Sequence, residues 1–535
     1  MIRLLYQIGR ADFLERTRRY SFLITLAITA YVGYTFVPPP DAHYLTVALG
    51  THRGVYNSAW MGSTVALMTS AFLSLAGFYL VKGAVDRDRT TRVGQILATT
   101  RMSSALYTVG KTLSNLAVLS AIVLVLAVVA LVMQLVRGED MQVRLWPLLS
   151  PFLLITLPWL AFVAALAVLF ETISWLRGGF GNVAYFFLWM SILATGAMTT
   201  SLFGTWQALA DPLGVSVPLN SMIESCKRVY PDYKETDVNI GYSILEKERI
   251  ATTFRWEGVE WSAGILLARF AWLVAGALLA LIAAFFFDRF NPSRESARVK
   301  RLSPENGGVD PAEEIPPPSR HSHLSPLHPE AKAFHLSRMV AAEIRLALTG
   351  RSRWWYIVSA GLLIACLAAP ANISRQWILP FAWIWPITIL SSLGCREEQH
   401  ETGLLVFSSP GALWRQFPAS LLAGIAVMVL TGCGTAIGNI RGGDWMSLAA
   451  WVTGALFVPS MALALGVWSG SSKLFEVLYT LLWYIGPMNQ VPFLDFMGAT
   501  SAAGDQGYFL YYLASSAFLI ACAFGGRRRQ MRLCA

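Results

Sequence analysis

The strongest constraint in this sequence is a series of apolar runs, each long enough to cross a lipid bilayer. A helix of roughly 20 apolar residues spans the hydrocarbon core, and about twelve such runs occur along the chain. Inside lipid every backbone N–H and C=O must find a partner within its own segment, so such runs fold as helices. The 535 residues are 55% hydrophobic and 14% charged, a balance that soluble domains rarely reach. The sequence therefore predicts an all-α integral membrane protein.

The apolar runs fall into two sets of six. They cover residues 20–36, 59–81, 113–136, 146–170, 183–203 and 261–287, and then 354–371, 377–393, 413–437, 445–468, 475–488 and 508–523. The stretch 288–335 between the sets is rich in Pro, Ser and charge, and we interpret it as a flexible cytoplasmic linker. The predicted domains are a six-helix half over residues 1–287, this linker, and a six-helix half over residues 336–535.

The net charge of +10 is unevenly distributed about the predicted membrane. With the N-terminus inside, roughly 30 of the 42 Lys and Arg lie on the inner side, as the positive-inside rule requires. Attraction to anionic membrane lipid explains this excess better than a nucleic-acid partner, and no nucleic acid is expected. We therefore expect a multi-pass protein of the bacterial plasma (inner) membrane with both termini in the cytoplasm.

Three further features limit the function classes. Residues 2–20 mix charged and apolar side chains at helical spacing, which predicts an amphipathic helix on the inner face and not a signal peptide. Of the six cysteines only Cys226 falls in an outer loop, the long segment 206–260, so no disulfide framework follows. The linker histidines lack Cys or carboxylate partners at ligand spacing, and no metal site is predicted. These histidines are His321, His323, His328 and His335.

The two halves align feature by feature, which indicates an internal repeat. Residues 11–13 before the first run correspond to residues 342–344 before the seventh, and a charged hairpin follows the second run of each half. Setting Gly94 against Gly403 pairs Arg87 with Arg396 and Asp88 with Glu397. Further on, residues 183–189 and 477–483 share four of seven identities, and residues 211–214 correspond to residues 495–498. Six runs is an even number, so the repeats are predicted to be parallel.

This pattern resembles the ABC-2 type transporter permeases over nearly the whole chain. The resemblance implies a fused permease of two tandem six-helix halves, with an amphipathic helix before each first span and a cytoplasmic coupling hairpin after each second span. The family hairpin often carries an acid, a Gly and then a Pro. Half two keeps Glu398, Gly403 and Pro410, whereas half one keeps Asp88 and Gly94 but has Arg101 where Pro would align.

What the resemblance implies for function is an exporter of a hydrophobic or amphipathic substrate such as a drug, an antibiotic or a lipid-like molecule. ATP and Mg would be bound by a separate ATP-binding subunit, in two copies, and this chain would hold no cofactor and be no enzyme. The residues implied in coupling to that subunit are Asp88, Gly94, Glu397, Glu398, Glu401 and Gly403. Physically, a short helix with charged residues on one face and Leu404 and Leu405 on the other suits a groove of a partner, although an ordinary charged loop has the same composition.

Two further motifs are weaker. Residues 105–112 match a relaxed phosphate-loop pattern around Gly110 and Lys111, but such a loop needs a strand before it and a helix after it, and no α/β domain is predicted here. Arg269 lies within the sixth run and either snorkels to the interface or lines a substrate path. The competing function is a twelve-helix secondary carrier, and a membrane enzyme or scaffold is a third reading. The scarcity of acids within the runs disfavours a proton-coupled carrier.

Overall fold

The computed structural model describes residues 2–18, 20–40, 42, 44–100, 102–198, 209–233, 238–244, 252–290, 335–349, 351, 353–409, 411–488, 491–500 and 507–534. The chain divides into two compact units, Met1–Arg294 (unit 1) and Glu295–Ala535 (unit 2). Each unit is described by itself. Most of the predicted linker 288–335 lies outside the described residues, since only 288–290 and 335 fall within them.

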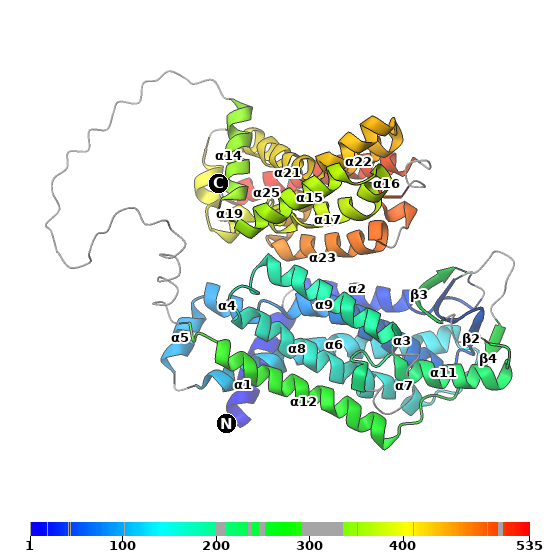
Figure 1. The fold of residues 1–535 in the computed structure, drawn as a ribbon. Helices are drawn as coiled ribbons and strands as arrows, with labels where there is room; N and C mark the ends of the chain where they lie inside the picture. The colour runs from blue at the N-terminus through cyan, green and yellow to red at the C-terminus, as the bar shows by residue number, and fades with distance from the viewer. Residues whose placement is uncertain are drawn as a thin grey trace. The chain divides into compact units, whose positions relative to one another are not determined.

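Unit 1 is mainly helical and carries one small sheet (Figure 1). Its helices are α1 (Ile2–Thr17), α2 (Tyr20–Thr35), α3 (Ser58–Val81), α4 (Ala84–Thr90), α5 (Val93–Thr99), α6 (Ser104–Arg137), α7 (Leu145–Pro151), the π-helix η1 (Phe152–Thr156), α8 (Leu157–Thr172), α9 (Gly179–Met198), α11 (Ser216–Val229) and α12 (Ala263–Phe286). Side chains start the long helices, because Asn57, Ser103 and Ser262 each accept a hydrogen bond from a backbone N–H of the first turn of α3, α6 and α12.

The regular elements among the described residues of unit 2 are all helices. Its elements are α14 (Leu336–Leu348), α15 (Arg353–Ala368), α16 (Ala371–Ile373), the π-helix η3 (Ser374–Ile378), α17 (Leu379–Ile384), α18 (Ile387–Leu390), α19 (Arg396–Gln399), α20 (Gly403–Phe407), α21 (Ala412–Gly442), α22 (Trp445–Ser469), α23 (Ser472–Trp483), the π-helix η4 (Tyr484–Met488), the 3-10 helix η5 (Pro492–Leu494) and α25 (Tyr508–Cys534). Gly443 and Gly470 end α21 and α22 in the left-handed conformation that glycine adopts at low cost.

Seven helices among the described residues are long and apolar enough to cross a membrane. They start at Ser58, Ser104, Leu145, Ala263, Ala412, Trp445 and Tyr508. Three predicted runs correspond to shorter apolar helices, Phe22–Thr35, Phe180–Thr195 and Arg353–Ala368. The described residues are thus mostly helical and compatible with the predicted helical membrane protein, while the number of twelve spans stays a prediction.

The two remaining predicted runs are not single α-helices. Run 377–393 is divided between η3, α17 and α18, with a break at Trp385 and Pro386. Run 475–488 continues from α23 into the π-helix η4, which contains Pro487. Proline removes a backbone donor and its ring displaces the preceding turn, so a hydropathy pattern alone does not foresee where such a helix bends.

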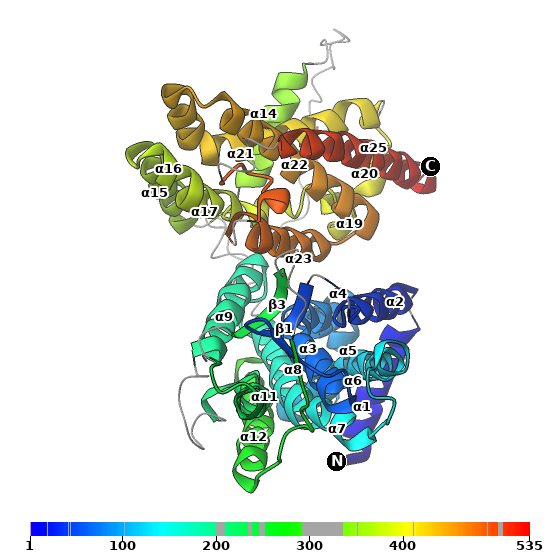
Figure 2. The same cartoon turned by 90° about the vertical axis from the view of Figure 1, so that its right-hand side faces the viewer.

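A four-stranded sheet in unit 1 was not predicted from the sequence. Its order is β3–β1–β2–β4, formed by β1 (Tyr44–Leu49), β2 (His52–Gly54), β3 (Val238–Ile244) and β4 (Thr252–Phe254). Strand β1 pairs antiparallel with β2 and β3, and β2 pairs parallel with β4. Figure 1 places the sheet at the opposite end of unit 1 from α4 and α5, and in Figure 2 the end of unit 1 that carries the sheet faces the viewer. Two strands come from the predicted outer segment 206–260, so part of that segment forms a folded cap.

The core of unit 1 is built around α3, most of whose residues are buried. The Phe78 ring stacks on Tyr185 with 3.5 Å between centroids, and the Tyr185 hydroxyl donates to the Ser74 carbonyl at 2.7 Å. Near the N-terminal end of α3, a Cβ on Gly62 would lie 2.2 Å from the Leu148 carbonyl oxygen. Glycine is therefore needed at position 62 so that α3 and α7 can approach each other.

The core of unit 2 has the matching aromatic residues of the predicted repeat. Tyr479 and Trp483 are fully buried on α23, where Tyr479 donates to the Trp383 carbonyl and Trp483 to the Pro380 carbonyl, both at 2.8 Å. In unit 1 the aligned Tyr185 and Trp189 likewise donate to α3 carbonyls. Aligned residues thus make the same kind of contact in both units.

Because α3 and α7 touch through backbone atoms at Gly62, we expect Gly62→Ala to destabilise the protein by about 1 to 3 kcal/mol. Gly361→Ala on α15 is the matched control, since a Cβ there meets nothing within 4 Å and alanine favours helix. Unfolding of both variants in detergent micelles, followed by circular dichroism, measures the difference. Equal stability of the two variants would contradict the close contact.

The predicted outer location of segment 206–260 needs a different probe from its natural cysteine. Cys226 is completely buried on α11, and burial raises the pKa of its thiol to about 11, so it resists thiol reagents. Glu224 is exposed on the same helix. We expect a membrane-impermeant maleimide added to intact cells to label Glu224→Cys and to spare Gln95→Cys on α5. The reverse pattern would invert the topology.

Candidate coupling hairpins

The α4–α5 hairpin of unit 1 is held at its start by one buried carboxylate. Glu171 at the end of α8 accepts hydrogen bonds from the backbone N–H groups of Gly83, Ala84, Val85 and Asp86. The last three bonds measure 3.1, 2.6 and 3.0 Å. These are the N–H groups that the first turn of a helix leaves without partners, and an anion is favoured there. Glu171 therefore fixes α4 to α8.

A second buried carboxylate, Asp12, joins three helices. Asp12 on α1 forms an ion pair with Arg87 on α4, and it accepts from Lys111 Nζ at 3.0 Å and from Ser114 Oγ at 2.5 Å on α6. Arg16, one turn later on α1, adds a 3.0 Å ion pair. Burial opposes the charge of Asp12, but the nearby cations and the Ser114 hydroxyl outweigh it and lower the pKa of this carboxyl below its ordinary value.

Asp88, a predicted coupling residue, lies inside this cluster. Its carboxylate is buried, 2.8 Å from Lys111 Nζ and 2.7 Å from the Tyr107 hydroxyl. Lys111 thus bridges Asp12 and Asp88 from within one continuous helix, α6, near its N-terminal end. The segment 105–112 that matched a phosphate-loop pattern is therefore helical, and its lysine is engaged in two ion pairs.

Gly94, the second predicted coupling residue of unit 1, is needed for close packing. A Cβ on Gly94 would lie 2.6 Å from the Phe290 ring. Phe290, just beyond α12, is buried in a cluster with Val85 and Tyr107, against which Leu97 and Phe287 also pack. The chain leaving α12 therefore holds α5 in place.

Unit 2 has a hairpin with equivalent contacts, α19–α20. Arg396 on α19 pairs with Glu343 on α14 at 3.0 Å, the positions that the sequence alignment set against Arg87 and Asp12. Glu397, aligned with Asp88, is also buried, and it pairs with Arg527 on α25 at 2.6 Å and accepts from Gln416 at 2.6 Å. The aligned acids of both hairpins are thus buried against cations of their own unit.

The remaining predicted coupling residues of unit 2 are on the surface. Glu398 and Glu401 are exposed, and Glu401 has a positive φ of 54° at the turn between α19 and α20. Leu404 and Leu405 on α20 are 67% and 78% exposed. Gly403 begins α20, and Pro410 lies outside the described residues. An acidic edge beside an exposed apolar ridge is therefore the outward face of this hairpin.

Arg269, the predicted substrate-path residue, holds a buried turn. Its Nη2 donates to the Asp211 carbonyl at 2.8 Å and its Nη1 to the Pro212 carbonyl at 3.4 Å. The Asp211 carboxylate in turn accepts from the backbone N–H groups of Gly214 and Ser216 at 2.9 and 2.6 Å. In unit 2 the aligned Asp495 accepts in the same way from Met497 and Thr500. These bonds give Arg269 a structural role.

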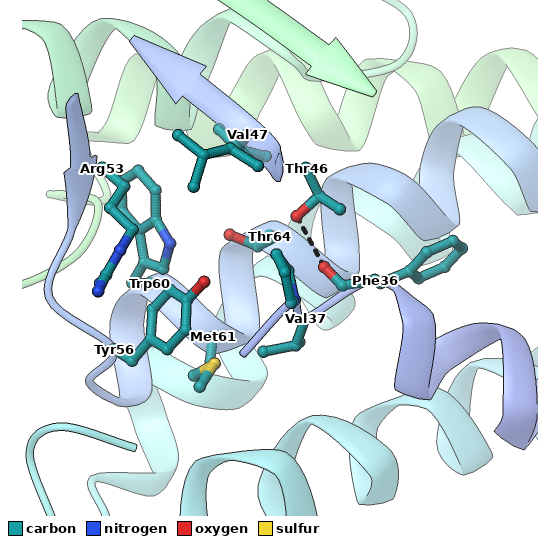
Figure 3. A pocket seen from close by; sticks show the side chains of 11 residues that line it. Phe36, Val37, Thr46, Val47, Arg53, Tyr56, Trp60, Met61 and Thr64 are labelled. Carbon is teal, nitrogen blue, oxygen red and sulfur yellow. Dashed lines mark hydrogen bonds between the residues drawn. The ribbon is translucent and has the colours of Figure 1, made fainter. Parts of the chain in front are cut away.

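A small cavity lies at the N-terminal end of α3, between the sheet and the end of α2 (Figure 3). Its volume of about 10 Å³ suffices for one water molecule and is too small for a substrate. Thr46 Oγ1 donates to the Phe36 carbonyl at its edge, and Arg53 beside it makes a bidentate pair with Glu139, each bond 2.8 Å long. These hydrogen bonds and this ion pair thus join the sheet to the helices.

No protein family, no curated protein and no solved structure matches this chain. The seven span-length apolar helices among the described residues are consistent with a helical membrane protein. Any finer role rests on the contacts within the chain itself.

Since Asp12 binds three cations, we expect Asp12→Asn to cost about 3 to 5 kcal/mol of stability. Glu15→Gln is the control on the same helix, because Glu15 is half exposed, pairs with Arg87 at 3.5 Å, and contributes about 1 kcal/mol or less. The folded-state pKa of Asp12 is depressed, so its stabilisation exists above the unfolded pKa and disappears as pH falls through the folded value. Unfolding of wild type and Asp12→Asn across acidic pH tests this, and an undiminished difference at low pH would refute it.

Proposed function

We propose that this chain is the membrane-spanning subunit of an ATP-binding cassette exporter for a hydrophobic or amphipathic substrate. It would be made of two tandem parallel six-helix halves, with both termini in the bacterial cytoplasm. Two copies of a separate ATP-binding subunit would bind ATP and Mg and drive it. The chain would itself be no enzyme.

One observation carries the proposal. In each unit a short helical hairpin is paired through an arginine to an acid on the amphipathic helix that precedes the first long helix, Arg87 to Asp12 and Arg396 to Glu343. That amphipathic helix packs in turn along the helix of the third predicted run of its half, α1 on α6 and α14 on α21. A displacement of either hairpin would therefore be transmitted into the spans. The presence of this arginine–acid linkage in both units favours a moving transporter over a static scaffold.

The twelve-helix secondary carrier is supported less well. A proton-coupled carrier relies on an acid in the transport pathway that gains and loses a proton. Glu171, Asp211 and Asp495 are instead occupied by backbone N–H groups. Transport that collapses with a protonophore while ATP is present would favour the carrier.

The docking surface in this proposal is the outward face of α19–α20. Glu398 and Glu401 would form charge-assisted hydrogen bonds in a basic socket, and Leu404 and Leu405 would fill its apolar part. Glu397 should not be changed in these tests, because its removal would leave Arg527 buried without its ion-pair partner and would destabilise the fold.

We therefore expect the double variant Glu398→Ala, Glu401→Ala to release the ATP-binding subunit or to uncouple its ATP hydrolysis from transport. Truncating one partner of a docked ion pair typically costs about 2 to 5 kcal/mol. The measurements are co-purification of the subunits and substrate-stimulated ATPase activity in liposomes.

Asp86→Ala supplies the matched control, since Asp86 is an exposed acid on the hairpin of unit 1. Its effect should be small. The double variant must keep the unfolding midpoint of the wild type. Full co-purification and full coupling in that folded double variant would leave α19–α20 as an ordinary loop.

A further inference from the structure

The hairpin of unit 1 presents a different surface from that of unit 2. Val93 and Ile96 on α5 are 43% and 67% exposed, so α5 carries an apolar outer face. An exposed apolar face beside charged residues marks a place where another molecule or a membrane binds. The question is which one.

The depth of α5 is set by α12. This helix has 24 residues, or about 36 Å at 1.5 Å per residue, slightly more than the hydrocarbon thickness of about 30 Å. Phe285 in its last turn is 87% exposed, as a lipid-facing side chain would be. Leu97 of α5 packs with Phe287 in the cluster around Phe290. Helix α5 therefore lies where α12 leaves the hydrocarbon, at the level of the lipid headgroups.

The exposed charges nearest to α5 include two arginines. Arg92 immediately precedes α5 and is exposed, and Arg289 is exposed on its other side, held by a 3.1 Å hydrogen bond from Nη2 to the Thr100 carbonyl. The exposed acids of this region lie on neighbouring segments, Asp86 on α4 and Asp288 before Arg289. Helices α19 and α20 and the turn between them instead expose Glu398 and Glu401. The apolar face of α5 is therefore bordered by arginine, whereas that of α20 is bordered by glutamate.

We propose that the outer face of α5, with Arg92 and Arg289, binds the anionic phospholipids of the inner leaflet. Ile96 and Val93 would enter the boundary between headgroups and acyl chains, and the two guanidinium groups would bind lipid phosphates. The inference needs only the membrane location of α12 and does not depend on an ATP-binding subunit. It gives the two hairpins separate tasks, lipid anchoring in unit 1 and protein docking in unit 2.

The test uses the full chain, without reactive cysteines, in liposomes. A fluorophore on Ile96→Cys reports contact with brominated phosphatidylglycerol mixed into phosphatidylcholine, and the same label on Leu405→Cys is the control on the acidic hairpin. We expect quenching at position 96 that saturates with phosphatidylglycerol, and little selective quenching at position 405. An arginine near an anionic surface contributes about fivefold in affinity, so Arg92→Gln with Arg289→Gln should weaken the response about 25-fold.

The conservative pair Arg92→Lys with Arg289→Lys keeps both charges and should retain most of the response, which separates lost charge from lost fold. Any of three results would overturn the inference. The first is that brominated phosphatidylcholine alone quenches the label at position 96 as strongly as brominated phosphatidylglycerol does, and the second is that soluble iodide quenches this label in every lipid mixture. The third is that the label becomes shielded only when an ATP-binding subunit is added, which would make α5 a protein-docking face.

Discussion

Buried carboxylates that accept backbone N–H groups hold this structure together at the points where its helices end. Away from water an unpaired N–H costs about as much as a lost hydrogen bond, and a membrane protein has no solvent there to provide a substitute. Glu171 takes up the N–H groups at the start of α4, and Asp211 and Asp495 do the same for turns in units 1 and 2. Each allows the chain to reverse without leaving donors stranded, and the long helices pack around these reversals.

Hydropathy predicted the long helices well, because lipid permits an apolar run few other structures. The alignment of Arg87 with Arg396 also placed two residues that make equivalent ion pairs. The sheet was missed because β1 finds its partner β3 only through the fold, nearly two hundred residues on, as the pair Val47 and Ile240 shows. Asp88 and Glu397 were expected to take part in coupling to a partner subunit, and only their cationic partners on other helices explain why they are buried.

Both hairpins are held by ion pairs, but they differ in how closely aromatic rings pack against their glycines. In unit 1 the aromatic ring of Phe290 lies under Gly94, and the ion pairs of Asp12 and Lys111 surround α4. In unit 2 the hairpin depends on Arg527, which pairs with Glu397 and lies over the Phe407 ring at 5.4 Å. A Cβ on Gly94 would lie 2.6 Å from the Phe290 ring, whereas one on Gly403 would meet the Phe407 ring at an ordinary 3.5 Å. The second hairpin is therefore less tightly packed at its glycine.

The sequence positions of the partners of Asp12 determine when its ion cluster can form during synthesis. Arg87 follows it by 75 residues and Ser114 by 102. At a synthesis rate of about 5 to 20 residues per second, α1 emerges roughly 5 to 20 s before the last of these partners exists. Until Arg87 is made, Arg16 is the only one of these cations that exists, which favours keeping α1 at the water-facing surface of the membrane. The ion cluster closes only after α6 has been made, and it thereby marks the completion of the chain through α6 during biogenesis.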